Sequence, residues 1–305
     1  MHDDEVDTDA FLVRRLLVGQ FTQWVDLDIE PVLSDGTDHA MYRLGGDLAA
    51  RLPRRPSAVR SMDKEHLWLP RLAPSLPLPV PMPLAKGTPG EGYPWSWSVC
   101  RWLAGETPTL GAVGADARFA VDLAAFLRAL QAVDATDAPR PGAHNHGRGA
   151  PLAQWRATIK DRLTGLAEMG DIGLVTSAWE ADAAVRAWDG PPVWIHGDLS
   201  AGNVLACGGR LAGVIDWSCL GAGDPACDLQ VAWTLFDHDG RDAFRAAMAV
   251  DEETWIRGRA WALAIAVLNL SYYRTRSGRI AEQGRNIIAA VLADHASKRG
   301  QPMSA

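Results

Sequence analysis

Residues 193–228 read VWIHGDLSAGNVLACGGRLAGVIDWSCLGAGDPACD, and this stretch is the most informative part of the sequence. Its apolar runs, VWIH, NVLAC and LAGVID, are short and separated by glycine-rich turns, which is typical of strands joined by tight connections. The pattern predicts a strand that leads into a His-Gly-Asp loop at 196–198, followed by a hairpin that ends at Asp216. Asn203 lies five residues after Asp198. We therefore expect one carboxylate, one amide and a second carboxylate to converge at the end of a small sheet.

These three oxygen-bearing side chains fit the chemistry of phosphoryl transfer. Magnesium prefers hard oxygen ligands in a near-octahedral arrangement and takes few of them from the protein, because nucleotide phosphates fill other positions. Asn203 and Asp216 can supply the protein oxygens, which leaves Asp198 to align an attacking hydroxyl and accept its proton. One alternative is a structural His196–Asp198 pair that caps the loop. Another is a His-x-Asp ligand pair for a transition metal, which lacks a third His or Cys at ligand spacing.

The first half of the chain predicts a small β-rich unit led by a helix. Apolar residues recur at helical spacing over 11–24, and the proline-rich stretch 74–89 favours extended chain or an edge strand. Gly45-Gly46 joins two strand-like runs as a tight hairpin does. The other predicted elements are strands at 29–33, 39–44, 47–52 and 95–103 and a helix at 57–69 that carries Glu65 and is stopped by Pro70.

After Gly105 the pattern changes to long helical segments. We predict helices at 115–133, 152–169 and 175–188, then the short strands of 193–216, then further helices from Asp224 to the end. This order is typical of the protein-kinase-like fold, in which a β-rich unit is followed by a connector and then by a helical unit with a few central strands. The predicted fold class is therefore α+β, two-lobed and protein-kinase-like. The predicted lobes are an N-lobe at 1–103 and a C-lobe at 104–305 with a small central catalytic hairpin.

The motifs HGDLSAGN at 196–203, IDW at 215–217 and GDPACDL at 223–229 resemble the signature of the aminoglycoside phosphotransferase and choline kinase superfamily. Within it, the pattern is most similar to the broad set of bacterial aminoglycoside-phosphotransferase-like proteins. The resemblance covers the whole order of predicted elements, and its sharply diagnostic part is the stretch quoted above.

The resemblance implies a role for each residue of this segment. Asp198 would be the catalytic base, and Asn203 and Asp216 would hold magnesium. His196 would pack and hydrogen-bond to shape the catalytic loop. Asp228 would brace this loop from the start of the next helix, through backbone N–H groups.

The same resemblance places nucleotide contacts in the N-lobe, where the match is weaker. Family members approach ATP with a turn between the first two strands, here 34–38, and the backbone amides of Ser34 and Gly36 can face the phosphates. An ordinary turn is the alternative. The connector at 98–102, with Val99 and Arg101, lies where kinases bind the adenine edge through backbone groups. Such contacts do not distinguish ATP from GTP.

One position departs from the family pattern. The third strand should carry a lysine that contacts the phosphates and pairs with a helix glutamate, and here the residue at that position is Arg51, with Glu65 as its partner. Arginine keeps the charge and can grip a phosphate with two nitrogens, but its planar fork differs from the compact ammonium of lysine. The alternatives are that Arg54 or Arg55 makes the contact, or that Arg51 and Glu65 form a surface ion pair.

The acceptor is expected on the C-lobe, between the catalytic loop and the terminal helices. Asp237 opens an acidic stretch that can meet the ammonium groups of an aminoglycoside. Trp233, Tyr272 and Tyr273 can line a broader, more apolar pocket. The alternatives are a solvated acidic loop and ordinary helix packing, and the basic residues within 274–279 argue against a purely cationic acceptor.

The composition excludes some partners. The 305 residues are 48% hydrophobic and 22% charged, and the net charge of −7 argues against a bulk affinity for nucleic acid or anionic membrane. The acidic N-terminus has no apolar signal region, and no uncharged run is long enough for a membrane span. Four cysteines without a C-x-x-C pair are typical of reduced thiols. We expect a cytoplasmic protein that binds a small-molecule hydroxyl acceptor, as a monomer or homodimer.

Three functions remain open from the sequence. The first is an ATP- or GTP-dependent, magnesium-requiring kinase whose acceptor is an aminoglycoside-like antibiotic or another amino-sugar. The second is a metabolite kinase of the same superfamily, of the choline, homoserine or sugar type. The third is a kinase-fold protein that binds nucleotide or ligand without turnover. The intact Asp198, Asn203 and Asp216 argue against the third, and the arginine in place of lysine keeps it open.

Overall fold

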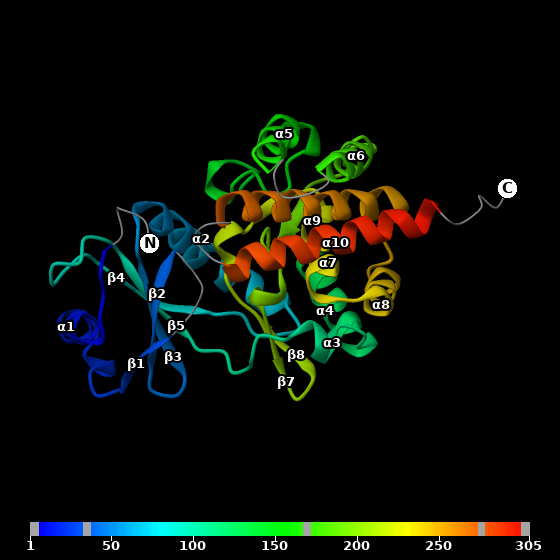
Figure 1. Ribbon diagram of the computed structural model, residues 1–305. Coiled ribbons are helices and arrows are strands. Elements are labelled where there is room, and N and C mark those ends of the chain that lie inside the picture. The colour runs from blue at the N-terminus through cyan, green and yellow to red at the C-terminus, as the bar shows by residue number, and fades with distance from the viewer. Residues whose placement is uncertain (1–5, 33–37, 167–171, 274–277, 300–305) are drawn as a thin grey trace.

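The computed structural model describes residues 6–32, 38–166, 172–273 and 278–299 (Figure 1). In the N-terminal part, five strands form one antiparallel sheet in the order β1-β2-β3-β5-β4. Helix α1 precedes this sheet in the chain, and α2 lies between β3 and β4. The bounds are α1 Ala10–Gln20, β1 Ile29–Val32, β2 His39–Leu44, β3 Leu48–Pro53, α2 Pro56–Leu72, β4 Pro83–Gly87 and β5 Trp97–Arg101.

The β2–β3 hairpin forms the centre of this sheet. Leu44 pairs with Leu48 across a turn in which Gly45 has a φ of +56°, a left-handed conformation that glycine adopts without steric cost. The predicted tight hairpin is confirmed. Strand β3 lies between β2 and β5, and all six of its residues are buried. Arg51 on this strand therefore lies inside the protein.

Helix α1 is shorter than predicted. Its first turn is capped by Asp9, whose side chain accepts a hydrogen bond from the backbone N–H of Leu12 (2.7 Å) and so satisfies a donor that has no partner within the helix. The helix ends at Gln20, because Thr22–Trp24 form a separate 3-10 turn. The predicted end at residue 24 included that turn.

Helix α2 continues past the proline that was expected to end it. The prediction is wrong because α2 runs to Leu72 with Pro70 inside it. Proline lacks the N–H that would bond the carbonyl four residues earlier, so one helical hydrogen bond is lost. That loss falls in the last turn, where Leu69 and Leu72 are buried and pack into the core of the C-terminal part. Tertiary packing retains the helix there.

The C-terminal part is mainly helical and contains two small antiparallel sheets, β6 with β9 and β7 with β8. The catalytic segment therefore runs between short strands. Helices α9 and α10 lie side by side across this part (Figure 1). The bounds are α3 Leu110–Val113, α4 Ala117–Gln131, α5 Arg156–Thr164, α6 Ile172–Ala183, β6 Val193–Ile195, β7 Val204–Cys207, β8 Arg210–Val214, β9 Gly221–Gly223, α7 Val231–Leu235, α8 His238–Met248, α9 Glu252–Tyr273 and α10 Gly278–Arg299.

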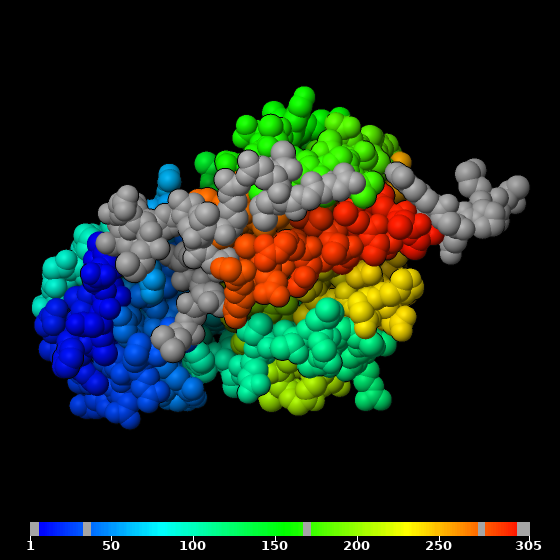
Figure 2. Space-filling view, in the orientation of Figure 1, coloured from blue at the N-terminus to red at the C-terminus, as the bar shows by residue number. Residues whose placement is uncertain are grey.

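Two hydrophobic clusters underlie the two parts. The smaller one lies between α1 and the five-stranded sheet and includes Leu16, Leu44 and Trp97. The larger one fills the C-terminal part and takes in Leu69 and Leu72 of α2. In Figure 2 the N-terminal part (blue and cyan) lies to one side of the C-terminal part. Helix α2 packs on both the N-terminal and the C-terminal part. The predicted lobe boundary at 103/104 stays a prediction.

The predicted order of elements in the C-terminal half is confirmed in outline. The helix expected at 115–133 is α4. The helix expected at 152–169 begins as a 3-10 turn and continues as α5. The helix expected at 175–188 is α6, which ends at Ala183. Strand β9 has no counterpart among the predictions, because Gly and Ala carry no strand preference. None of the helices in the described ranges is long and apolar enough to cross a membrane.

Candidate active site

The catalytic loop at 196–198 leaves β6 and is braced by a buried carboxylate. Asp228 is fully buried, and its Oδ2 accepts the backbone N–H of His196 (2.7 Å) while its Oδ1 accepts that of Gly197 (2.8 Å). Burial raises the pKa of Asp228, and these two N–H groups oppose that rise. The backbone contacts that the resemblance implied for Asp228 are present, and they fix the chain just before Asp198.

His196 connects the catalytic loop to the end of β8. Its ring is fully buried and tilted against Trp217, with 4.8 Å between the ring centroids. Nε2 lies 2.9 Å from the carbonyl oxygen of Ile215, and Nδ1 lies 3.3 Å from the backbone nitrogen of Asp198. Since a carbonyl only accepts and an amide N–H only donates, these partners require a neutral ring with its proton on Nε2. His196 therefore shapes the loop.

Gly197 occupies a position that only glycine fits. Its φ is +84°, and a Cβ at this position would lie 2.4 Å from the carbonyl oxygen of Cys219. The chain must pass this close for the loop to sit between β6 and the turn after Asp216.

We expect Gly197→Ala to lower both the stability and the activity of the protein. The left-handed conformation alone costs about 1–2 kcal/mol for a residue with a Cβ, and the clash with Cys219 displaces the adjoining Asp198. The matched control is Gly208→Ala, because Gly208 also has a positive φ (+56°) but a Cβ there would meet no other atom within 4 Å. Thermal unfolding and kcat should separate the two variants. Equal activity in both would show that the loop tolerates the displacement.

The β7–β8 hairpin brings Asn203 next to Asp216. The Asn203 side-chain nitrogen donates to the carbonyl of Asp198 (2.8 Å) and lies 3.5 Å from its Oδ2. The backbone N–H of Ile215 donates to the carbonyl of Asn203 (2.9 Å), and Asp216 Oδ1 accepts the N–H of Ser218 (3.3 Å). Among the described residues, these bonds use the side-chain nitrogen and the backbone carbonyl of Asn203, and they leave its amide oxygen without a donor.

This donor set fits magnesium. One amide oxygen and one carboxylate are hard ligands, and such a small set leaves most positions around the ion to phosphates and water. A transition-metal centre would need more nitrogen or sulfur ligands. Among residues 6–32, 38–166, 172–273 and 278–299, no group of three or more His, Cys, Asp or Glu side chains is placed to hold a metal. Asn203 and Asp216 are therefore the candidate magnesium ligands.

The two carboxylates of the site differ electrostatically. Burial raises the pKa of Asp198, which Arg148 opposes and the charge of Asp216 reinforces. Burial also acts to raise the pKa of Asp216, but the charge of Arg51 and a side-chain hydrogen bond from Ser218 outweigh it, and the pKa is lowered. Asp198 is thus the better proton acceptor and Asp216 the more firmly ionised group, which is the division that a base and a metal ligand require.

On the nucleotide side, the structure brings Arg51 and Glu65 together. Two guanidinium nitrogens face the two carboxylate oxygens, with Nη2 at 3.3 Å from Oε1, and the residues are only 7% and 2% exposed. This is a buried, bidentate pair, so the surface-pair alternative is wrong. Burial raises the pKa of Glu65, and Arg51 opposes that rise. Ser34 and Gly36 lie outside the described residues.

We expect Arg51→Ala to raise the KM for the nucleotide or cut kcat sharply, and to destabilise the fold. The substitution leaves Glu65 buried without its cation, which typically costs about 3–5 kcal/mol. Arg51→Lys keeps the charge and should retain part of both properties. Steady-state kinetics and thermal unfolding measure the two effects separately. Unchanged kinetics in a destabilised Arg51→Ala protein would move the phosphate contact to Arg54 or Arg55.

The connector begins later than predicted. Val99 is fully buried inside the sheet, paired with strands on both sides, and β5 continues to Arg101. The backbone N–H of Arg101 donates to the carbonyl of Met82 (2.9 Å). This N–H is therefore already used, and an adenine contact at Arg101 would have to come from its carbonyl. The segment free of strand pairing starts at Trp102.

A loop that sequence reasoning missed lies beside Asp198. It reads HNHGRG at 144–149, and Arg148 Nη2 lies 3.7 Å from Asp198 Oδ1. The pKa of His146 is lowered by burial first and by Arg148 second, while the charge of Asp198 acts in the opposite direction. The only signal was three basic side chains and two glycines within six residues. Nothing local connects this loop to a carboxylate 50 positions later.

Lys64 and His39 were also missed. Lys64 Nζ donates to the backbone carbonyls of Ser218 (2.8 Å) and His144 (3.2 Å), which attaches α2 to the loop after Asp216. Burial lowers the pKa of Lys64 to about 8. His39 is 8% exposed at the start of β2, and burial, followed by the charge of Arg51, lowers its pKa to about 3. His39 is therefore neutral near pH 7.

The residues predicted to contact the acceptor lie on or beside α7, α8 and α9. Trp233 is 3% exposed and packs against Trp255, with 4.9 Å between the ring centroids. Asp237 caps α8 by accepting a backbone N–H (3.1 Å), and Tyr272 and Tyr273 pack on each other (4.7 Å). These are contacts of helix packing and capping, as the alternative interpretation expects. An acceptor role for these four residues stays a prediction.

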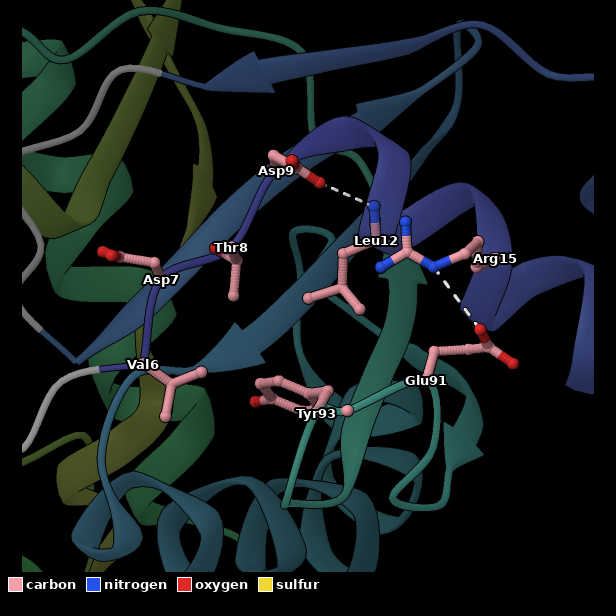
Figure 3. Close-up of a pocket in the computed structure, with 9 residues that line it drawn as sticks. Val6, Asp7, Thr8, Asp9, Leu12, Arg15, Glu91 and Tyr93 are labelled. Carbon is pink, nitrogen blue, oxygen red and sulfur yellow. Dashed lines mark hydrogen bonds and ion pairs between the residues drawn. The ribbon is translucent and has the colours of Figure 1, made fainter.

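A surface hollow of about 290 Å³ lies at the start of α1 (Figure 3). It is lined by residues 6–9, Leu12, Arg15 and residues 91–93, with an ion pair between Arg15 and Glu91 (3.4 Å). None of the predicted site residues that the structure describes lines this hollow.

The sequence matches the model of the family described as "Phosphotransferase enzyme family" over residues 29–263, which is more than half of the chain. No curated protein matched the sequence. Solved structures did match. APH(2'')-IIIa in complex with GDP and kanamycin has a TM-score of 0.73 at 19% identity, covering 92% of this chain and 98% of that chain.

Two further structures extend this comparison. ADP-bound aminoglycoside phosphotransferase APH(2'')-Ib has a TM-score of 0.63 at 18% identity, covering 93% of this chain and 97% of that chain. Apo macrolide 2'-phosphotransferase MphH from Brachybacterium faecium has a TM-score of 0.60 at 21% identity, covering 97% and 100%. At these identities the similarity shows the fold. The predicted α+β, two-lobed, protein-kinase-like fold is confirmed.

Proposed function

Because this chain belongs to the phosphotransferase enzyme family, we propose that it moves the γ-phosphoryl group of ATP or GTP to a hydroxyl of an aminoglycoside-like or other amino-sugar acceptor. One observation carries this proposal. The side-chain nitrogen of Asn203 donates a hydrogen bond to the backbone carbonyl of Asp198. The backbone carbonyl of Asn203 accepts the N–H of Ile215, which precedes Asp216. A single residue thereby links the candidate base to the candidate metal ligand.

In the proposed reaction, Asp198 aligns the acceptor hydroxyl and takes its proton. Its pKa, raised by burial, suits it to that task better than an ordinary aspartate. Asn203 and Asp216 would hold magnesium, which when bound neutralises charge on the nucleotide phosphates. Asp228 and His196 keep the loop in place, and Arg51 presents a positive charge from β3.

Support for the acceptor class is less direct. The chain resembles a protein solved with kanamycin and, at similar identity, a macrolide phosphotransferase. A net charge of −7 is compatible with a cationic acceptor. We therefore place amino-sugars first and treat macrolide, choline, homoserine and simple-sugar acceptors as alternatives for the test to separate.

The test has two stages. Thermal unfolding with ATP and Mg2+, with each alone, and with GTP measures nucleotide binding without an acceptor. An ADP-release assay then covers kanamycin-like aminoglycosides, macrolides, choline, homoserine and sugars, with Asp198→Asn protein as the background control. Release of ADP with aminoglycosides, and not with macrolides, choline, homoserine or sugars, supports the proposed acceptor. Stabilisation by nucleotide with no release from any acceptor, and no slow hydrolysis, would make this a binding protein.

A further inference from the structure

Arg148 is a buried cation whose charge is only partly compensated. The residue is 9% exposed, and Nη2 approaches Asp198 Oδ1 to 3.7 Å, which is too long for a hydrogen bond. Nε and Nη1 are buried and have no hydrogen-bond partner in the described part of the chain. Covering a guanidinium in this way is costly, and a buried donor without a partner calls for an explanation such as a catalytic role or a bound ion.

The fold fixes the backbone on both sides of Arg148. Asn145 is fully buried, and its side chain donates to the carbonyl of Arg148 (3.1 Å) while accepting the N–H of Gly142 (3.0 Å). Gly149 has a φ of +77°, and a Cβ there would lie 2.6 Å from the side chain of Ile195 on β6. The carbonyl of Gly149 accepts the backbone N–H of Asp224 (3.0 Å), which directly follows β9. The segment is therefore fixed against the two strands that flank the catalytic segment.

The guanidinium also rests beside an aromatic ring. Its central carbon lies 5.8 Å from the ring centroid of Trp155, a distance at which the ring face attracts a cation. This contact stabilises the cation without using its N–H donors, and Nη2 lies 3.7 Å from the carboxylate of Asp198.

Three other cations around the site already have partners among the described residues. Arg51 faces Glu65, Arg55 faces Asp38, and Lys64 donates to backbone carbonyls. Arg148 differs because its closest acidic partner is the candidate base itself. That carboxylate must turn to an acceptor hydroxyl during the reaction, so the guanidinium cannot have it as a permanent partner.

We propose that Arg148 is a further catalytic residue, whose guanidinium contacts the phosphoryl group as it passes to the hydroxyl aligned by Asp198; this inference depends on the proposed phosphotransferase activity. In that step the acceptor hydroxyl gives its proton to the Asp198 carboxylate, and its oxygen forms a bond to the γ-phosphorus. The bond from this phosphorus to the β–γ bridging oxygen breaks, and the nucleoside diphosphate leaves with the electron pair. Arg148 neither gains nor loses a proton. Negative charge spread over the transferred group is what its N–H donors stabilise.

The first test measures binding rather than turnover. ADP with Mg2+ and aluminium fluoride places a planar, phosphoryl-like anion beside the nucleotide, and isothermal titration compares this mixture with ADP and Mg2+ alone. We expect wild type to bind ADP more tightly when fluoride is present. The ADP affinity of Arg148→Met without fluoride should stay within about threefold of wild type. The increase in ADP affinity that fluoride causes should be at least about tenfold smaller in this variant than in wild type, because the lost contact is made to the transferring group. Arg148→Lys, which keeps the charge and most of the volume, should regain part of it.

The second test uses kcat with the acceptor found above. Arg148→Met should lower kcat by about 10²–10³-fold with little change in the KM for nucleotide, as loss of a transition-state donor does. Arg140→Met is the matched control, because Arg140 is an exposed arginine in the same connection and should leave kcat unchanged. Added guanidinium ion should partly restore Arg148→Ala.

The outcomes separate the two proposals. Equal fluoride tightening and equal kcat in wild type and Arg148→Met would overturn the role of Arg148 while leaving the phosphotransferase proposal intact. Parallel loss of ADP binding, thermal stability and kcat in both Arg148→Met and Arg148→Lys would assign Arg148 a structural role and also overturn it. A wild-type protein that binds no ADP would remove the proposed function, and the inference with it.

Discussion

Replacing Asp198 with asparagine is expected to lower kcat by about 10²–10⁴-fold while leaving nucleotide binding nearly unchanged. Asparagine has the same size and can keep the backbone contacts to His196 and Asn203, but its amide cannot accept the proton of a hydroxyl. The measurement is kcat with the acceptor found in the ADP-release assay, together with the nucleotide-induced shift in thermal unfolding.

The control for this variant is Asp161→Asn on α5, where the residue is exposed and the same charge is removed. This control should behave as wild type. If Asp198→Asn instead loses less than tenfold in kcat, another group takes the proton, or proton transfer does not limit the reaction. A loss of nucleotide binding in Asp198→Asn would point to a distorted loop.

The catalytic segment could be predicted because it is local in the sequence. Asp198, Asn203 and Asp216 lie on one stretch whose strand and turn signals are strong, and the structure joins them through hydrogen bonds of 2.8–2.9 Å along that stretch. Asp228 belongs to the same segment, and its contacts with backbone N–H groups follow from the resemblance. The Arg51–Glu65 pair spans 14 residues, and it was placed by the resemblance, which pairs a cation on the third strand with a glutamate on the following helix.

The remaining parts of the site depend on tertiary packing. Arg148 reaches Asp198 only because a loop with three left-handed residues, His146, Gly147 and Gly149, is fitted against β6 and β9. No periodicity or spacing records that contact. The continuation of α2 past Pro70 is a similar case, since burial of its last turn outweighs a local helix-breaking signal. Propensity is a weak predictor wherever burial decides.

Helix α2 connects these observations. Two adjacent residues of α2 make different attachments. Lys64 donates to the carbonyl of Ser218, beside the candidate metal ligand Asp216, and Glu65 pairs with Arg51 on the central strand. Arg51 in turn lowers the pKa of Asp216 across the space between the two parts. The position of α2 therefore sets the nucleotide side and the metal side of the site together.

A second large effect is expected at Asp182 on α6, far from this chemistry. The residue is 2% exposed and accepts two bonds from Arg259 on α9 (both 2.8 Å), and its Oδ2 lies 3.0 Å from Nε2 of His295 on α10. Asp182→Ala leaves Arg259 buried with only Asp294 as an acidic partner among the described residues. We expect the free energy of unfolding to fall by about 3–5 kcal/mol, measured by denaturant titration.

The pH dependence of this effect has a definite sign. Burial acts to raise the pKa of Asp182, but the bonds from Arg259 and His295 outweigh it, and the pKa is lowered in the folded protein. The contribution of Asp182 is therefore fully present above the unfolded pKa of about 3.9 and is lost as the pH falls through the folded value. The gap in stability between wild type and Asp182→Ala should be constant near neutral pH and shrink below pH ~4.

The exposed pair of Asp189 and Arg186 is the control, because Asp189→Ala should cost at most about 1 kcal/mol. Equal losses in the two variants would mean that burial of the α6–α9–α10 network adds nothing to its strength.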